Sequence, residues 1–295
     1  LRTDNEKTGD FHCSDESINT IDTIIKHSIE SNMYSVFTDC PHIEKLGWLE
    51  VANLMFYSMS QTYDIRAWMR KIVGDVVDSQ CDNGYIPAIA PECQRISPLA
   101  HDPNWSGVCT LIPWDYYEVY GDTSLMKLAY KTMVGYVIYL EEETRFNNHL
   151  IKFAQMGDWG AYDSSTPKEL VASCAFYNIA DTVSKTAEIL GNKEDSVRFR
   201  GLSDDIKRSV NAKYYNNETG VYGTGSQASF ACPLYAGLVE EENVYRTVDK
   251  LVEAVSACGY HLSTGEVALK QMITALAKYG RNDIVYKMEI GRAHV

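Results

Sequence analysis

Apolar residues recur every three or four positions along most of this 295-residue chain, which is the period of an amphipathic α-helix. The first such segment runs from Ser14 to between Met33 and Val36, and Asp15 at its start suits a helix N-cap. Gly191 follows another segment, as a C-terminal cap commonly does. Further helices are predicted at residues 41–55, 63–76, 113–120, 122–140, 169–190, 193–213, 240–255 and 265–279.

Alternation typical of strands occurs only in short pieces such as residues 220–222. The predicted helices come in pairs, with short turns within a pair and long irregular loops between pairs. This layout predicts an all-α fold, an α/α toroid in which inner and outer helices alternate and the loops at one rim build a pocket. No linker of low complexity divides the chain, so one domain is expected over residues 1–288.

Two long irregular stretches carry aromatic and acidic residues. Residues 81–113 contain Asp102 and Trp105, and a loop this long in a compact domain is usually functional. Asp158 and Trp159 stand between two glycines in the second stretch, residues 153–167, where a tight backbone would expose them. The alternative for these residues is ordinary loop packing or turn formation.

The stretch from Thr38 to Trp48 is the candidate centre of the chemistry. Pro41 suits the first turn of a helix, and in such a helix Glu44 and Trp48 share one face. Apolar surroundings would then raise the pKa of Glu44, as a general acid requires. Gly47 disfavours a helix and indicates that another group approaches its backbone closely. Alternatively, Asp39 is an N-cap, Glu44 a solvated acid and Trp48 a core residue.

Composition narrows the partners. The net charge of −13 and pI near 5.0 oppose a nucleic-acid partner, which needs a basic surface. No run of about 18 apolar residues predicts a membrane span. The eight cysteines lack zinc-site spacing, which predicts no metal site and favours buried free thiols in a reducing, cytoplasmic compartment. No cofactor-binding motif is found; the glycines at 220–225 do not form a phosphate loop.

Residues 39–49, DCPHIEKLGWL, resemble the signature of the bacterial α-L-rhamnosidases of glycoside hydrolase family 78. The resemblance implies an (α/α)6 barrel in which Glu44 is the general acid and Asp39 binds the rhamnose hydroxyls. Further matches, in family order, lie at residues 11–14, 102–105, 113–114, 120–122, 157–159 and 261–265.

The resemblance also implies a reaction, the hydrolysis of terminal α-L-rhamnosides with inversion, and a partner, a rhamnose-containing glycoside or polysaccharide. An inverting mechanism needs one carboxylic acid at the leaving oxygen and a second carboxylate that activates water. The remaining expected substrate-binding residues are apolar walls and hydrogen-bonding groups. They are Trp48, Asp102, Trp105, Asp158, Trp159 and, ranked below these, His261.

Three departures from the family pattern are visible. Ile43 replaces an arginine that the family usually has beside the acid, and Val51 lies where some members carry an aspartate, for which Glu50 is a substitute. The family's general base lies in a motif beyond the point where this chain stops, so a fragment incomplete at both ends is expected, with residues 289–295 a non-native tail. The alternatives are a carbohydrate-binding pseudoenzyme of the same fold, or a helical scaffold with its loop tryptophans buried.

Overall fold

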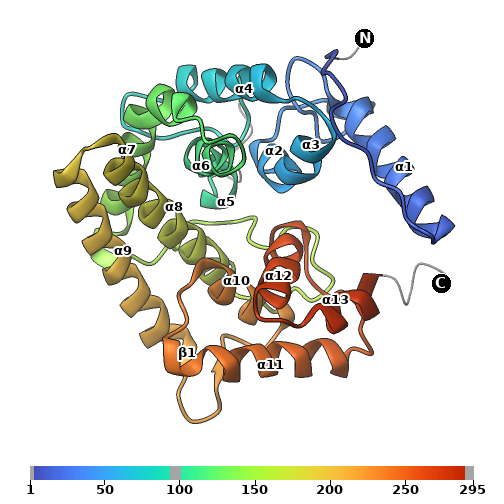
Figure 1. The fold of residues 1–295 in the computed structure, drawn as a ribbon. Coiled ribbons are helices and arrows are strands. Elements are labelled where there is room, and N and C mark those ends of the chain that lie inside the picture. Colours follow the sequence, from blue (N-terminus) through green and yellow to red (C-terminus); the bar gives the residue numbers. More distant parts are fainter. Residues whose placement is uncertain (1–2, 94–100, 290–295) are drawn as a thin grey trace. The chain divides into compact units, whose positions relative to one another are not determined.

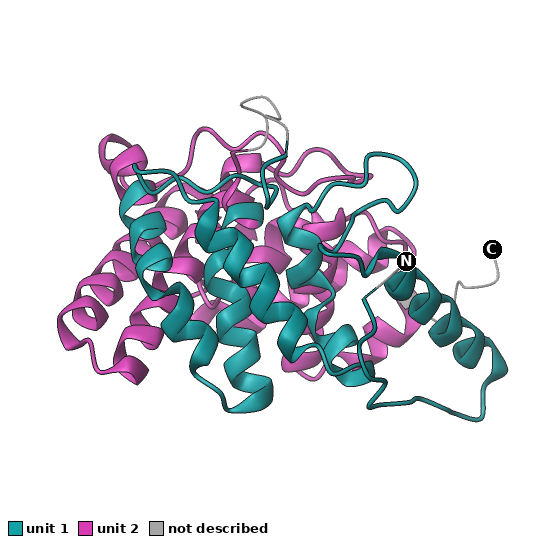
Figure 2. Cartoon of the chain, turned by 90° about the horizontal axis from the view of Figure 1, so that it is seen from above, with its two compact units in different colours: residues 1–98, 105–139 teal, residues 99–104, 140–295 magenta. Residues whose placement is uncertain are grey.

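The computed structural model describes residues 3–93 and 101–289 of the chain, and it is mostly helical. Two compact units are distinguished: residues 1–98 with 105–139, and residues 99–104 with 140–295 (Figure 2). The all-α prediction is confirmed, because in the described residues the one sheet is a two-stranded hairpin. No helix among the described residues is both long and apolar enough to cross a membrane.

The first unit begins with a helix that was predicted from its cap. Asp15 Oδ1 accepts a hydrogen bond from the Ser17 N–H at 2.8 Å and starts α1, which spans Glu16–Asn32. The other helices of this unit are α2 (Leu49–Leu54), α3 (Phe56–Thr62), α4 (Arg66–Asp78), α6 (Val108–Tyr120) and the first part of α7 (Ser124–Thr144); α5 (Pro103–Ser106) bridges residues of both units in the sequence.

Helix α6 is central to the first unit. It contacts α2, α3 and α4 (Figure 1), and Phe56, Met69 and Ile112 are fully buried there. The helix begins at Val108, although the irregular stretch was expected to reach residue 113. Burial of the apolar side chains before Pro113 outweighs the hydrogen bond that a proline inside a helix lacks.

The second unit contains the predicted long hairpin. Helices α8 (Lys168–Leu190) and α9 (Lys193–Tyr214) pack against each other, and Gly191 between them has a φ of 83°, as its cap role requires. The remaining elements are the η2 turn (Arg145–Asn147), β1 (Tyr215–Asn216), β2 (Val221–Tyr222), α10 (Gln227–Ala236), η3 (Glu241–Asn243), α11 (Val244–Ala257), α12 (Glu266–Lys278) and α13 (Asn282–Glu289).

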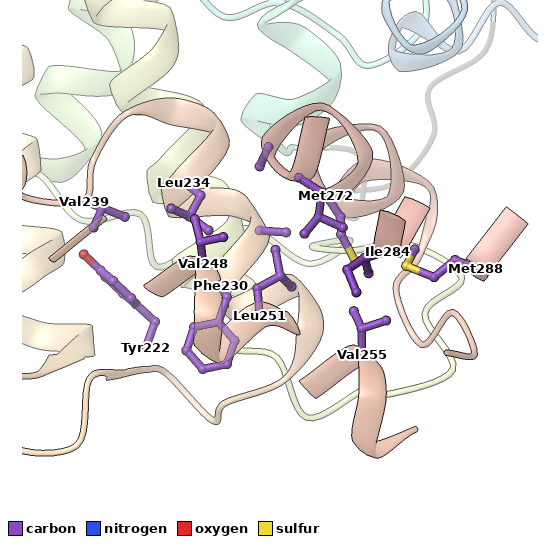
Figure 3. Close-up of a cluster of buried hydrophobic side chains, with 13 residues drawn as sticks. Tyr222, Phe230, Leu234, Val239, Val248, Leu251, Val255, Met272, Ile284 and Met288 are labelled. Carbon is purple, nitrogen blue, oxygen red and sulfur yellow. The ribbon is translucent and has the colours of Figure 1, made fainter. Parts of the chain in front are cut away.

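Helices α10, α11, α12 and α13 enclose one hydrophobic cluster in the second unit (Figure 3). Phe230, Leu251 and Met272 come from three of these helices and are at most 2% exposed. Helix α10 was not predicted. All of its residues from Gln227 to Leu234 are buried, so it lacks the polar face that makes a helix visible in a sequence.

All eight cysteines, each of them among the described residues, are free thiols, as predicted. The expectation that most are buried is wrong. Three are buried, at positions 109, 174 and 232, while Cys81, Cys93 and Cys258 are exposed. The loop positions of Cys81 and Cys93 explain the difference, because no helix face covers them.

Candidate active site

The segment around Glu44 is a turn, and the helix predicted from Pro41 does not form. Residues 41–44 make the turn, and helix α2 begins only at Leu49. Residues 47–49 instead pair with residues 88–90: Ala90 N–H donates to the Gly47 carbonyl at 3.2 Å and Leu49 N–H to the Ala88 carbonyl at 2.9 Å. This pairing keeps the backbone extended up to Leu49, where α2 begins. The prediction that Glu44 and Trp48 share one helical face is therefore also wrong.

The close approach predicted at Gly47 is confirmed. A Cβ at this position would lie 3.0 Å from the Ala90 carbonyl oxygen and 3.0 Å from the Val36 Cβ. A side chain at this position would force its neighbours to shift by a few tenths of an ångström. Gly47 therefore keeps the turn of residues 41–44 close to the strand-like segment that follows Ile86.

Asp39 and Glu44 form the electrostatic centre of this turn. Their carboxyl groups share a hydrogen bond, and the Asp39 N–H donates to the Leu46 carbonyl at 3.1 Å. Burial, followed by the Glu44 carboxylate, raises the pKa of Asp39. The hydrogen bond from Asp39 lowers the pKa of Glu44, whose side chain is exposed.

The expected direction of the Glu44 shift is therefore wrong for the free protein. Trp48 does contact Glu44, but through a hydrogen bond that favours the carboxylate, and this contact contributes to the lowered pKa. Both acids are exposed, so Trp48 provides little desolvation for Glu44, and the pKa that partial desolvation raises is that of Asp39.

Cys40 lies beside the two carboxylates. Its Sγ is 3.9 Å from Asp39 Oδ2, and donor atoms of Asp39, Cys40 and Glu44 lie within 4.8 Å of one another. Such a set includes ligand types that a divalent cation uses, but burial and the two acids raise the pKa of the thiol and oppose the thiolate that would bind. The cluster is better suited to sharing protons than to holding a metal.

Trp105 and Asp102 are both buried. Trp105 is 2% exposed within the first unit. Asp102, in the second unit, is fully buried and its carboxylate is engaged by the protein: Oδ1 accepts from Asn104 N at 3.0 Å and Nδ2 at 2.8 Å, and Oδ2 accepts from Gly157 N at 3.0 Å. Burial raises the pKa of Asp102. Its contacts are those of a residue that anchors the loop beginning at Gly157.

Asp158 joins two motifs that lie far apart in the sequence. Its Oδ2 accepts from Gly265 N at 2.7 Å and its Oδ1 from Ala268 N at 2.9 Å, so it caps the N-terminus of α12. Burial raises the pKa of this carboxyl group. The Glu266 N–H donates to the Trp159 carbonyl at 3.0 Å, which fixes the position of the tryptophan.

Trp159 and His261 are presented at the surface by these joined loops. The Trp159 side chain is 57% exposed, and His261 is exposed. Gln227 holds the second loop: its Nε2 donates to the His261 carbonyl at 2.9 Å and its Oε1 accepts from Ser263 N at 3.0 Å. The second unit thus brings Asp158, Trp159 and His261 onto adjoining loops.

Two residues near the candidate site were not predicted as part of it. Gln227 is 1% exposed and supports the His261 loop; its only indication in the sequence is a polar residue at the start of an apolar run. Cys40 was considered only as one of the eight free thiols and not as a neighbour of the two acids. Two positions where the sequence differs from the family pattern can also be placed. Ile43 is 69% exposed beside Glu44, whereas Glu50, the possible substitute for an aspartate, is 4% exposed within α2.

The described residues form mostly paired helices, and the turn between α1 and α2 carries a carboxyl pair, a layout compatible with a helical-hairpin glycosidase domain. The chain belongs to the family of the bacterial alpha-L-rhamnosidase six-hairpin glycosidase domain, which matches residues 6–293. The predicted (α/α)6 fold class is confirmed by this match and by the solved structures below.

Curated relatives and solved structures agree with this family. An alpha-L-rhamnosidase of Formosa agariphila is 27% identical over 291 residues, which are 96% of this chain and 31% of that protein. The alpha-L-rhamnosidase structure from Dictyoglumus thermophilum superposes with a TM-score of 0.93 at 30% identity, covering 99% of this chain and 34% of that one.

A third similar protein was solved with a sugar. The Streptomyces avermitilis alpha-L-rhamnosidase complexed with L-rhamnose has a TM-score of 0.90 and 25% identity, and the match covers 97% of this chain and 27% of that one. The chain therefore spans about a third of the length of the relatives that it matches.

Proposed function

We propose that the protein hydrolyses terminal α-L-rhamnosides with inversion, with Glu44 as the general acid and Asp39 as the residue that binds the sugar hydroxyls. Membership of the rhamnosidase family and the rhamnose complex of the Streptomyces relative support the substrate class. Inversion uses two carboxyl groups about 6.5 to 9.5 Å apart. In this chain Glu44 would be the member of that pair that acts as the acid.

One observation carries the assignment: the hydrogen bond between Asp39 and Glu44, with one pKa raised and the other lowered. Two carboxyl groups in contact hold one proton between them over a range of pH, because both cannot ionise cheaply. In this proposal a glycoside that binds there meets a carboxyl pair that can share a proton beside its leaving oxygen.

Substrate binding would move that proton to Glu44. Sugar hydroxyls that donate to Asp39 favour its carboxylate form, and the sugar ring shields Glu44 from water and raises its pKa. The proton then passes from Asp39 to Glu44 along their hydrogen bond and from Glu44 to the departing alcohol. Trp48 is proposed as an apolar wall beside Glu44. Trp159 and His261, which adjoin each other in the second unit, are proposed separately as sugar-contacting residues.

A carbohydrate-binding protein without catalysis is the second candidate function. The lowered pKa of Glu44 and the exposed Ile43 in place of a donor favour it, because an ionised carboxylate cannot protonate a leaving group. In this case Asp39 would help to hold a rhamnoside that is not cleaved.

The experiment compares Glu44→Gln with the unchanged sequence in the full-length protein on two aryl α-L-rhamnosides, one with a phenol and one with a dinitrophenol leaving group. Loss of a general acid should lower kcat/KM at least 100-fold for the phenyl glycoside and much less for the dinitrophenyl one, which leaves without a proton. Glu143→Gln, an exposed glutamate on α7, is the matched control.

An equal loss on both substrates would remove Glu44 from the acid role. Rhamnose binding by calorimetry without turnover of either substrate would support the second candidate instead.

A further inference from the structure

A basic hollow lies in the second unit, away in sequence from every residue assigned above. Its volume is about 640 Å³, within the range of ligand sites, and it is open to solvent. One wall comes from the segment after η2 and the other from the last turns of α9. The cationic residues on its walls are Lys152, Arg208 and Lys213.

Three cations around one hollow are notable in a chain with a net charge of −13. Arg208 is paired with Asp205 on its own helix, which reduces its effect. The described residues place no carboxylate in ion-pair contact with Lys152 or Lys213, and the Lys213 ammonium lies 4.8 Å from the Tyr214 ring centroid. The hollow therefore keeps cationic groups that can meet an anionic ligand.

The other groups on the walls suit the hydroxyls of a sugar. Asn147, Asn148 and Ser209 line the hollow beside the cations, and amide and hydroxyl groups can each donate and accept hydrogen bonds. Only Leu150 and Ala212 add apolar surface. The hollow is far larger than a single inorganic ion needs, and it combines polar and apolar surface as a sugar does.

The residue before Asn147, which lines the hollow, carries an exposed aromatic ring. Phe146, in η2, is 89% exposed, and the Arg145 guanidinium carbon is 4.4 Å from its ring centroid. An apolar ring costs free energy when left in water, and its face can pack on the C–H groups of a sugar ring. The ring and the amides of Asn147 and Asn148 are therefore consecutive in the sequence, on the segment that forms one wall of the hollow.

The segment that carries these groups is already shaped. Asn148 and His149 adopt left-handed φ angles of 51° and 57°, and the His149 N–H donates to the Thr144 carbonyl at 3.2 Å. Asn147 Nδ2 donates to the Leu150 carbonyl at 2.6 Å. A bend held in this way presents its side chains without a large ordering cost on binding.

We propose that this hollow binds an acidic oligosaccharide, with Lys152, Arg208 and Lys213 facing its carboxylate groups and Phe146 packing on a sugar ring. The site does not depend on Glu44 or on the proposed hydrolysis. It would hold an acidic chain through ionic contacts that salt weakens.

The test uses calorimetry with a galacturonic acid tetramer, its neutral methyl ester and inorganic sulfate as probes. The acidic tetramer should bind, the methyl ester should bind at least tenfold more weakly, and sulfate should compete only at far higher concentration. The triple variant K152Q/R208Q/K213Q should lose at least tenfold in affinity. Phe146→Ala should weaken the tetramer several-fold and leave the competition by sulfate unchanged.

A matched triple variant, K127Q/K131Q/K193Q, removes the same charge from exposed lysines elsewhere and should bind as the unchanged chain does. Thermal unfolding of both triple variants checks that they are folded. The proposal is overturned if the two triple variants lose affinity equally, if the methyl ester or sulfate binds as tightly as the acidic tetramer, or if no binding occurs at millimolar tetramer.

Discussion

The carboxyl groups of Asp39 and Glu44 share a hydrogen bond, and their pKa values shift in opposite directions. Both side chains are exposed, but partial desolvation and the neighbouring carboxylate raise the pKa of Asp39, whereas the hydrogen bond from Asp39 lowers that of Glu44. The two groups titrate as a pair, so a change to one must appear in the titration of the other.

Asp39→Asn is expected to raise the pKa of Glu44, because the hydrogen bond from Asp39 is the largest cause of its lowering. The converse change, Glu44→Gln, should lower the pKa of Asp39 without restoring its ordinary value, since burial remains. Titration of the carboxyl carbons by NMR measures both shifts. Asp82→Asn, an exposed aspartate, serves as the control, and an unchanged Glu44 titration in Asp39→Asn would show that the pair is not coupled.

His101 should make stability depend on pH. Burial lowers its pKa from 6.5 to about 4, and its ring stacks on Phe153 with centroids 4.0 Å apart. The folded state binds the proton less tightly than the unfolded chain, so this contribution is present above pH 6.5 and is lost as pH falls toward 4. The loss is on the order of 2 kcal/mol.

Urea unfolding of the unchanged chain and of His101→Phe at several pH values between 7 and 4 tests this. The phenylalanine keeps a ring on Phe153 and removes the titration, so its stability should fall less over that range. His27→Phe, at an exposed position, should follow the unchanged chain. Parallel curves for all three proteins would contradict the assignment to His101.

Gly265→Ala is expected to destabilise the protein by about 3 kcal/mol, because a Cβ there would lie 2.1 Å from the Trp159 carbonyl oxygen. The two joined loops cannot both keep their positions. Gly201→Ala is the matched change: nothing lies within 4 Å of its Cβ, and in the interior of α9 alanine should stabilise by about 1 kcal/mol. Equal effects of the two variants in urea unfolding would show that the loops are not packed as described.

Asp158→Ala should lower the free energy of unfolding by about 2 kcal/mol, since the N–H groups of Gly265 and Ala268 lose their acceptors at the start of α12. Asp158→Asn, which can accept at one atom only, should cost less. Chemical denaturation gives both values, and Asp204→Ala, an exposed position on α9, should change stability by less than about 0.5 kcal/mol. A cost for Asp158→Ala as small as that control would refute the capping role.

The sequence predicted helices well wherever one face is polar and one apolar. The α8–α9 hairpin was expected at residues 169–190 and 193–213 and is found at Lys168–Leu190 and Lys193–Tyr214. Helix α10 escaped prediction because burial on all sides removes that contrast. At Pro41 the local preference for a helix start loses to pairing with residues 88–90, a partner that no local pattern reveals.

Some features of the candidate site could likewise be predicted from the sequence, and others could not. Motif resemblance located the turn with Asp39 and Glu44, and the close approach at Gly47 followed from its residue type. The direction of the Glu44 pKa shift depends first on its hydrogen bond with Asp39, and the sequence does not show that contact. Asp158 was recognised, but its partners lie 107 and 110 residues further along the chain.

The short stretch that includes Asp102 has a consequence for attempts to take the protein apart. It belongs to the second unit, while the residues on both sides of it belong to the first, so one scission cannot yield the two units intact. A split after Tyr139 would leave Asp102 on the N-terminal piece and strip Gly157 of its acceptor. Two fragments separated after Tyr139 should therefore regain the Asp102–Gly157 hydrogen bond only when they associate. Neither fragment should fold as an independent module.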